Sequence, residues 1–221
     1  MQEDESSSLS FPLLLDASSA KVHVGVPSKD DWLFLERHDP PALTSLFKGV
    51  RKCLANLGSS LQAVDAILFC EGPGSTLGLR VALTLTKTLL GQISPAPPVF
   101  TYNALHAARS LTDNPSLPIL VDYRQGQWYL QEPSGEIRIV EEEEASGLAA
   151  SSQFLRQRKS WRQFPESGPD VKYDLSRLRG LRDLSKILHR AAKPTLFDLR
   201  PATFQKWKPL QDSENLSPGT P

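Results

Sequence analysis

The sequence is poor in cysteine, methionine and long apolar runs, and it carries no excess of charge. Its 221 residues contain two cysteines, Cys53 and Cys70, too few for a disulfide framework or a cysteine-based metal site. Both lie in apolar stretches, so we expect buried, reduced thiols. The four histidines are scattered, and none has the short helical spacing of a paired metal ligand.

Charge and hydropathy exclude further classes of protein. The 25 basic and 25 acidic residues balance, so the chain lacks the long-range positive field expected of a protein that grips nucleic-acid phosphates directly. No apolar run approaches the roughly 20 residues that span a bilayer, and we expect no membrane association. The first ten residues are acidic and polar, unlike a signal peptide, which favours a reducing, cytoplasmic location.

Polar ends flank the part of the chain that can fold. Residues 1–10 and 211–221 offer nothing to bury, so we expect both to be disordered. Between them, the apolar pattern changes character near residue 100. This change predicts one lobe over 11–100 and a second lobe over 101–210, both of the α/β class.

The first half alternates strand-like and helix-like patterns. Three apolar or alternating runs separated by hairpin-length gaps predict an antiparallel meander. Apolar residues at three- and four-residue spacing predict two helices, and Gly58 follows the first where a C-terminal cap belongs. In chain order, the expected elements are strands at 11–16, 21–26 and 32–36, a helix at 43–57, a strand at 66–70, a helix at 76–90 and a strand at 99–101.

The second half gives weaker signals. Short apolar runs predict strands at 119–122, 127–130 and 137–140. Apolar residues from Leu175 to Ala191 outline one amphipathic helix with Asp174 as its N-cap. The four glutamates at 141–144 indicate a solvated strand end or loop, with a cation-binding patch as the alternative. No element is predicted over 145–173.

A glycine-rich turn between the strand at 66–70 and the helix at 76–90 is the sharpest local feature. Its sequence is EGPGSTLGLR over 71–80. Glycines at a strand-to-helix turn are typical of a phosphate cradle and equally of a tight turn that packs the helix on the sheet. A Walker A loop is excluded because no lysine follows Gly78. A dinucleotide fingerprint is disfavoured because Pro73 removes a backbone donor and the next strand ends without an acidic residue.

Asp16 is the second candidate, at the carboxyl end of the first strand and before Ala17 and Ser18. A carboxylate in this position could hold a Mg²⁺-nucleotide. It could equally cap the following turn through its side chain. The missing glycine after Asp16 favours the turn.

The helix at 76–90 carries an unusually wide apolar arc. Leu77, Val81 and Leu85 lie on one face, and further apolar residues extend the arc to both sides. Such an arc indicates burial on more than one side. Either the second lobe of the same chain covers it, or another subunit does.

These motifs together resemble the TsaB/YeaZ family. LLDAS at 14–18 is similar to the family's opening LALDTS, and VHVGV at 22–26 resembles the strand that follows it. LQAVDAI at 61–67 looks like the family's LSDLDAI. GPGSTLGLR at 72–80 is similar to its hallmark GPGSFTGLR.

Two later segments continue the resemblance in the same order. DYRQGQWY at 122–129 looks like the family's DARMGEVY. KPTLFDLR at 193–200, followed by Trp207 and Lys208, resembles the family's closing motif. The resemblance thus spans about residues 12–208.

The resemblance implies an ASKHA (actin/Hsp70-like) fold of two ribonuclease-H-like lobes. It implies a non-catalytic subunit of the machinery that makes N6-threonylcarbamoyladenosine (t6A) at position 37 of tRNA. The expected partners are a TsaD-type transferase, a TsaE-type ATPase and, as a homodimer, a second copy; tRNA contact is indirect. No cofactor is expected on the chain alone, with ATP and metal on the partner subunits.

The resemblance also assigns two sets of site residues. The family motif and turn residues are Asp16, Ser18, Gly72, Pro73, Gly74, Ser75, Gly78, Leu79 and Arg80. The expected partner interface consists of Leu43, Phe47, Val50, Leu54, Leu77, Val81, Thr84, Leu85 and Thr88.

The sequence departs from the family at several of these motifs. Ala17 replaces the threonine that follows the first aspartate, and the family's His-Ser pair is missing near Ala42 and Leu43. Two alternatives therefore stay open. One is an ASKHA-type ATPase or phosphotransferase that uses Asp16 and the turn at 72–75, although the chain lacks the Asp-x-Gly phosphate loop and the adenosine-pocket motif expected of such an enzyme. The other is a divergent homodimeric relative with another role.

Overall fold

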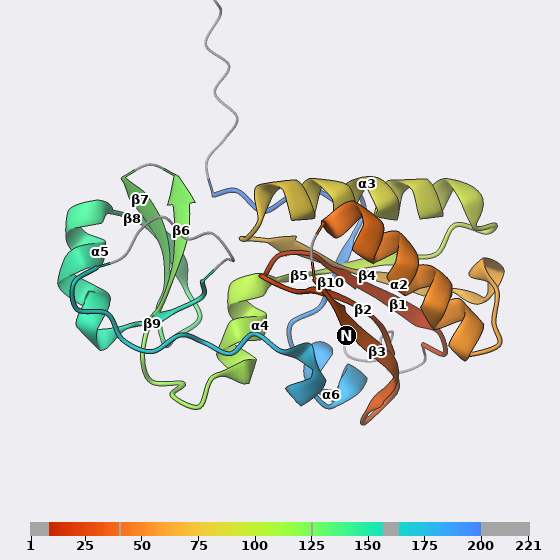
Figure 1. Ribbon diagram of the computed structural model, residues 1–221, viewed down its shortest axis with the longest axis horizontal. Helices are drawn as coiled ribbons and strands as arrows, with labels where there is room; N and C mark the ends of the chain where they lie inside the picture. The colour runs from red at the N-terminus through yellow and green to blue at the C-terminus, as the bar shows by residue number, and fades with distance from the viewer. Residues whose placement is uncertain (1–8, 40, 125, 157–163, 200–221) are drawn as a thin grey trace, which may run out of the picture.

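The computed structural model describes residues 9–39, 41–124, 126–156 and 164–199. Residues 1–8 and 200–221, which hold most of the predicted disordered ends and Trp207 and Lys208 of the closing motif, lie outside this part. The described strands form two sheets that lie beside one another (Figure 1).

The larger sheet has six strands in the order β10-β5-β4-β1-β2-β3. β1 pairs antiparallel with β2, and β2 with β3, which confirms the predicted meander. β1, β4 and β5 run parallel to one another, and β10 pairs antiparallel with β5. The bounds are Pro12–Asp16 for β1, Val22–Pro27 for β2, Trp32–His38 for β3, Ala66–Gly72 for β4, Val99–Asn103 for β5 and His189–Ala191 for β10.

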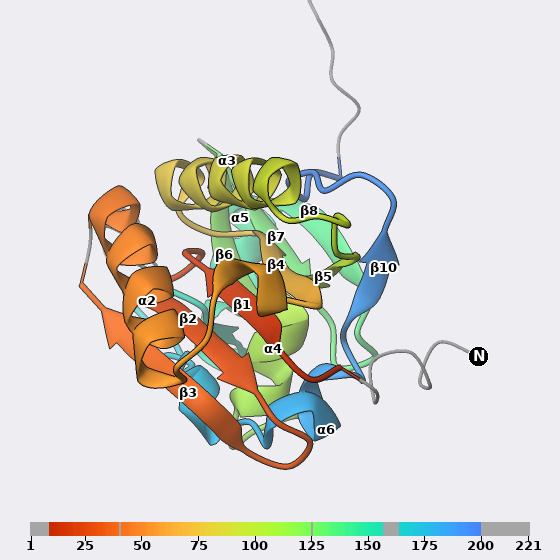
Figure 2. The ribbon, with the colours of Figure 1, turned by 90° about the vertical axis from the view of Figure 1, so that its right-hand side faces the viewer.

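Helices cover both faces of this sheet (Figure 2). α2 (Ala42–Asn56) and α3 (Thr76–Gln92) lie on one face, and α4 (Ala104–Leu111) and α6 (Gly180–Leu184) on the other. Side chains alternate along each strand, so Leu13 and Leu15 of β1 pack under α2 and α3 while Leu14 points to the α4 side. This double burial explains why the strand reads as a continuous apolar run.

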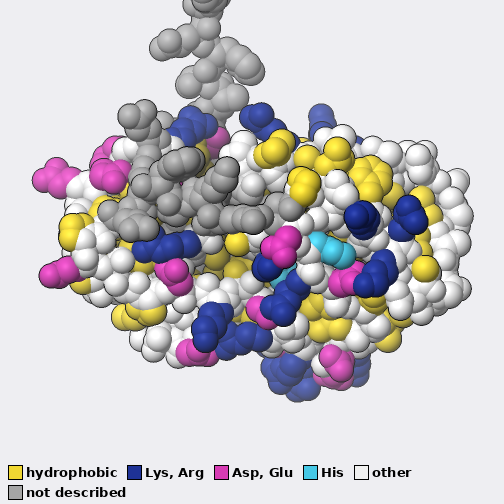
Figure 3. All heavy atoms as spheres, viewed as in Figure 1, with side chains coloured by type: hydrophobic (Ala, Val, Ile, Leu, Met, Phe, Trp, Pro, Cys, Tyr) yellow, Lys and Arg dark blue, Asp and Glu magenta, His cyan; other side chains and the backbone are white. Residues whose placement is uncertain are grey.

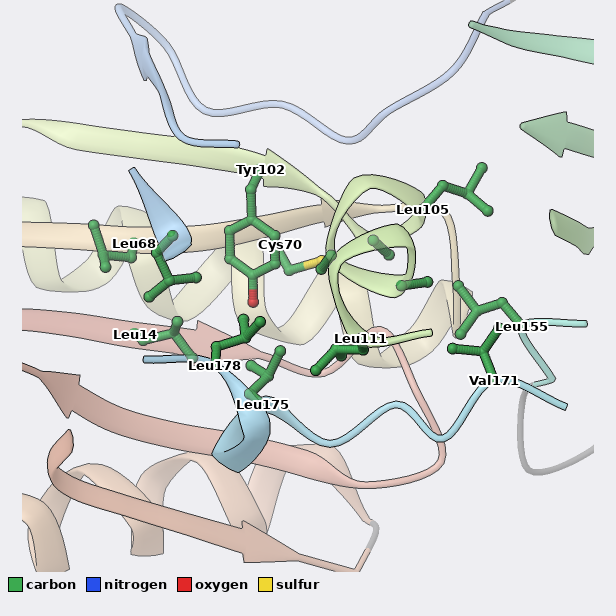
Figure 4. Packing of buried hydrophobic residues seen from close by; sticks show 14 of the residues in the cluster. Leu14, Leu68, Cys70, Tyr102, Leu105, Leu111, Leu155, Val171, Leu175 and Leu178 are labelled. Carbon is green, nitrogen blue, oxygen red and sulfur yellow. The ribbon is translucent and has the colours of Figure 1, made fainter. Parts of the chain in front are cut away.

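The smaller sheet has four strands in the order β8-β7-β6-β9. Its strands are β6 (Ile119–Arg124), β7 (Gln127–Gln131), β8 (Ile137–Glu141) and β9 (Gln153–Phe154), with α5 (Glu142–Leu148) beside them. Ile119, Val121 and Tyr129 belong to the same buried cluster as α4 and the α4 side of the larger sheet. The two sheets therefore share a core, in which Tyr102 lies beside Cys70 (Figure 4).

The predicted helix from Leu175 to Ala191 is wrong. The segment forms a 3-10 turn at Leu175–Arg177, the short helix α6 and strand β10. Gly180 has a φ of 50°, and a Cβ there would lie 2.2 Å from the backbone oxygen of Asp31, so the chain turns where a helix would continue. Asp174 still caps, since its carboxylate accepts a hydrogen bond from the backbone N–H of Ser176 at 3.1 Å.

The glutamate run agrees with the prediction only in part. Glu141 ends β8, and Glu142, Glu143 and Glu144 form the first turn of α5. Acidic side chains are favourable there because the amino end of a helix carries a partial positive charge. α4, α5, β9 and β10 were not predicted from the sequence. No helix in the part of the chain that the structure describes has the length and apolar character to cross a membrane.

Candidate functional site

The glycine turn packs directly against the turn that follows β1. The backbone N–H of Ser75 donates a 2.8 Å hydrogen bond to the backbone oxygen of Ser18. A Cβ on Gly74 would lie 2.2 Å from that oxygen, and a Cβ on Gly78 would lie 2.2 Å from the backbone oxygen of Ala17. Gly74 and Gly78 therefore permit a close approach of two backbones.

The same turn starts α3. Ser75 is the N-cap, and its hydroxyl accepts a 3.3 Å hydrogen bond from the backbone N–H of Gly78. Gly72 has a φ of 106°, a conformation that favours glycine, and Leu79 packs beneath it with 5% of its surface exposed. The Gly72–Pro73 peptide bond is cis. The start of the helix is thus held by its own cap and by the β1 turn.

The carboxylate of Asp16 is fully buried and accepts four hydrogen bonds. Its Oδ1 accepts from the backbone N–H of Ser18 at 2.8 Å and from the Ser18 hydroxyl at 2.6 Å. Its Oδ2 accepts from the hydroxyls of Tyr102 and Tyr173, both at 2.7 Å. An ionised carboxylate offers about four acceptor sites, so protein donors occupy all of them.

Four titratable side chains surround this carboxylate, namely Tyr102, Tyr173, Cys70 and His23. Burial raises the pKa of the Tyr102 hydroxyl and of the Cys70 thiol, and the negative charge of Asp16 raises both further. Burial lowers the pKa of His23, which lies opposite Asp16 on β2 and has no exposed surface. The ring of Tyr173 meets the His23 ring edge-on, with centroids 6.1 Å apart. All these groups are therefore neutral at pH 7.

Sequence reasoning did not find Tyr102, Tyr173 or His23. Tyr102 lies on a short strand whose pattern shows burial and nothing more. Tyr173 comes from the stretch for which no element was predicted, 157 positions along the chain from Asp16. An alternation of His23 with buried valines was visible, but it does not identify the facing residue.

A Mg²⁺-nucleotide does not fit this arrangement. Asp16 has no acceptor site left for a metal or its water, and the backbone N–H of Ser75 in the glycine turn is already bonded to the backbone oxygen of Ser18, so it is not available to a phosphate. Among the residues that the structure describes, no group of three or more His, Cys, Asp or Glu side chains could hold a metal ion. The turn interpretation of Asp16 therefore agrees with the geometry.

A cleft of about 490 Å³ lies on the outer side of the glycine turn. Pro73, Gly74 and Arg80 line it from one side, and the β6–β7 corner and residues 196–198 line it from the other. Asp198 connects the segment at 193–200 to the motif at 122–129, since its carboxylate accepts hydrogen bonds from the Tyr123 hydroxyl at 2.8 Å and from Arg124 at 3.0 Å. The cleft thus brings together three motifs that are far apart in the sequence, and Asp16 is not among its lining residues.

The second surface of interest is the outer side of α2 and α3. Large apolar side chains are exposed there: Leu43 by 57%, Phe47 by 49% and Leu77 by 73%. A groove of about 240 Å³ runs between the two helices. Its lining residues are Leu43, Phe47, Arg80, Val81, Thr84, Leu85 and Thr88. Figure 3 shows hydrophobic side chains gathered over these helices.

Most of the residues predicted for a partner interface lie on this surface, which the second sheet leaves uncovered (Figure 1). Thr84 and Thr88 are exposed, and Leu54 and Val81 are partly buried. Val50 and Leu85 are 8% and 4% exposed, so they pack mainly within the chain. The α2–α3 face, as we call this surface, therefore consists of Leu43, Phe47, Leu77, Val81, Thr84 and Thr88.

Solved structures are similar to this chain. YeaZ from Pseudomonas aeruginosa aligns with 26% identity and a TM-score of 0.46 over 59% of this chain, and the match spans 66% of that protein's length. A second structure aligns with 20% identity and a TM-score of 0.58 over 87% of this chain and 100% of its own. It is described as an uncharacterized protein with similarity to peptidase YEAZ from Pseudomonas aeruginosa. No curated protein matches the sequence.

A family model also matches the sequence. Residues 43–159, more than half of the chain, match the model of TsaD, tRNA N6-adenosine threonylcarbamoyltransferase. The matched region begins at α2 and includes the glycine turn and α3. The chain therefore belongs to this family and has its ASKHA fold.

Proposed function

We propose that this chain is a non-catalytic subunit of the t6A machinery and that it supports a TsaD-type transferase by docking through the α2–α3 face. The observation that carries the proposal is the exposed apolar surface of Leu43, Phe47 and Leu77. Contiguous apolar surface at a groove is typical of a protein interface.

The buried network around Asp16 supports a docking role over catalysis by the chain itself. A nucleotide-dependent ASKHA enzyme needs a carboxylate that can reach a metal or a phosphate-bound water. Here the carboxylate is enclosed by Ser18, Tyr102 and Tyr173. We therefore propose that ATP and metal bind to the partner subunits and that contact with tRNA is indirect.

The first experiment measures binding to the TsaD-type transferase of the same organism. We expect a complex at micromolar concentration that co-elutes in size-exclusion chromatography. Phe47→Asp should weaken it at least tenfold, because a charge then has to be buried at the centre of the groove. Leu33→Asp is the matched control, since Leu33 is 53% exposed but lies on the edge strand β3.

Two outcomes would contradict the proposal. One is the absence of any complex at micromolar concentration. The other is an equal effect of Phe47→Asp and Leu33→Asp, which would place the contact elsewhere. Calorimetric titration of the isolated chain with Mg-ATP tests the alternative of an ATPase or phosphotransferase, and micromolar binding would favour that alternative.

A further inference from the structure

The two helices of the α2–α3 face contain no acidic residue. α2 carries Lys48, Arg51 and Lys52, and α3 carries Arg80 and Lys87. The whole sequence balances 25 basic residues against 25 acidic ones, so this distribution is uneven. The docking face is therefore a local region of positive charge on a chain without net charge.

Three of these cations border the apolar groove. Arg80 lines the groove itself. Arg51 follows the exposed ring of Phe47 by one helical turn, and Lys87 follows Arg80 by two turns along the same stripe. All three side chains are exposed. Lys52 differs from them because it pairs with Glu36 of β3.

A second copy of this chain is a poor occupant of such a face. In a two-fold symmetric dimer the same patch meets itself, so the basic borders of both copies would lie across one interface with no acidic residue from either helix pair to offset them. Like charges placed opposite each other across an interface disfavour association. The charge pattern therefore selects against self-pairing.

We infer that the α2–α3 face selects a different protein, whose docking surface presents apolar side chains bordered by Asp and Glu carboxylates. This inference rests on the proposed docking function of the same face and specifies the chemistry of the partner. The apolar side chains fill the groove at Leu43 and Phe47, and the carboxylates meet Arg51, Arg80 and Lys87. Carboxylates at the border add specificity and speed of association.

A nucleic acid is a weaker candidate for this surface. Phosphates would satisfy the cations, but the face also exposes Leu43, Phe47 and Leu77, each by about half or more of its surface. A phosphate backbone does not bury aliphatic side chains, whereas an apolar protein surface does. The combination of groove and border thus favours a protein.

The test reverses two border charges in the full-length chain. Arg51→Glu with Lys87→Glu is compared with Lys29→Glu with Lys172→Glu, two exposed lysines outside α2 and α3. We expect the first pair of changes to weaken binding to the TsaD-type transferase by at least tenfold and the control pair by less than threefold. Raising the salt from about 50 mM to about 500 mM should weaken wild-type binding, because exposed charges are then screened.

Self-association is measured in parallel by sedimentation at both salt concentrations. We expect the wild-type chain to be monomeric at low salt. A dimer that Phe47→Asp dissolves, and that forms as readily at low salt as at high salt, would overturn the inference. The sedimentation measurement tests the inference even if no complex with the transferase forms. The absence of that complex refutes the proposed function alone.

The other outcomes are equally distinct. If the transferase binds but charge reversal leaves its affinity unchanged, the proposed function stands and the inference fails. Anisotropy titration with tRNA provides the last comparison. If charge reversal weakens tRNA binding and leaves transferase binding unchanged, the face is a nucleic-acid surface and the inference is wrong.

Discussion

Replacing Gly78 by alanine places a methyl group where the structure has the backbone of the β1 turn. The new Cβ would lie 2.2 Å from the backbone oxygen of Ala17, far inside van der Waals contact. Because the obstacle is backbone, α3 or the turn has to move, and the hydrogen bond from Ser75 to Ser18 is then strained. Gly91 offers a matched control on the same helix, since a Cβ there meets nothing within 4 Å.

The expected signs of the two substitutions are opposite. Alanine is favoured over glycine inside a helix by about 0.5–1 kcal/mol, and Gly91→Ala should gain roughly this amount. Gly78→Ala has the same gain but incurs an overpacking cost of about 1–3 kcal/mol or more and weakens a hydrogen bond worth about 1 kcal/mol. We expect a net loss of about 2–3 kcal/mol in the free energy of unfolding.

Urea and thermal denaturation followed by circular dichroism measure this difference. For a chain of this size, 1 kcal/mol corresponds to about 2–4 °C in Tm. Gly78→Ala should therefore lower Tm by about 5–10 °C, and Gly91→Ala should raise it by a few degrees. Equal stability of the two variants would refute the packing explanation. It would restore the phosphate-cradle interpretation, in which the glycine serves a ligand and not the fold.

Three further predictions concern the buried groups. Tyr102→Phe removes a hydrogen-bond donor from the buried carboxylate of Asp16 and should lower the free energy of unfolding, measured by urea denaturation, by about 1.5–3 kcal/mol. Tyr123→Phe removes a donor from an exposed carboxylate and should lower it by less than about 1 kcal/mol, and equal losses would contradict this reasoning. The pKa of His23 is lowered in the folded state, so the stability that the neutral ring contributes is fully present above pH ~6.5 and is lost as the pH falls below that value. His23→Asn should therefore reduce the loss of unfolding free energy between about pH 6.5 and 5. Burial raises the pKa of Cys53 to about 11 and that of Cys70 well above its usual range, so neither thiol should react with Ellman's reagent at about pH 8 until the protein is unfolded.

The first half of the fold could be predicted because its signals are local. α2 and α3 each bury one stripe against the sheet, and this stripe appears in the sequence as apolar residues at three- and four-residue spacing. β1 and β4 are buried on both faces and read as continuous apolar runs. The glycine at position 58, with a φ of 57°, follows α2 where a cap was expected.

The segment after residue 145 could not be predicted because its order comes from distant contacts. Leu175, Leu178, Leu181 and Leu184 are all buried in the core that α4 shares. Their regular spacing imitates a helix, but it arises from successive short turns that pack on the same surface. β9 and β10 have two and three residues. Such short strands are defined by their partners, β6 and β5, and carry no pattern of their own.

In the candidate site too, features that depend on local sequence could be predicted and features that depend on distant contacts could not. The position of the glycine turn between strand and helix was visible, as was the aspartate at the end of β1. Their contact was not, because nothing local indicates that Gly74 and Gly78 accommodate the backbone at Ala17 and Ser18. The second tyrosine on the carboxylate of Asp16 comes from a part of the chain without periodicity. The sequence therefore predicted where the site lies but not that its turns pack against each other or that two tyrosines bind the Asp16 carboxylate.

The net charge of the chain does not reveal how charge is distributed over its surface. A balanced total excludes a strong field around the whole molecule, but it does not exclude charged faces, because acidic and basic residues need not mix on the surface. Here the fold gathers five basic residues and no acidic ones on α2 and α3, beside exposed Leu43, Phe47 and Leu77. An apolar centre supplies affinity to any protein surface of matching shape, including a second copy. The surrounding charges supply the discrimination, since they repel an identical face and attract an acidic one. If the α2–α3 face docks as proposed, substitutions at its border residues alone can change the preferred partner, while the groove and the buried network around Asp16 remain unaltered.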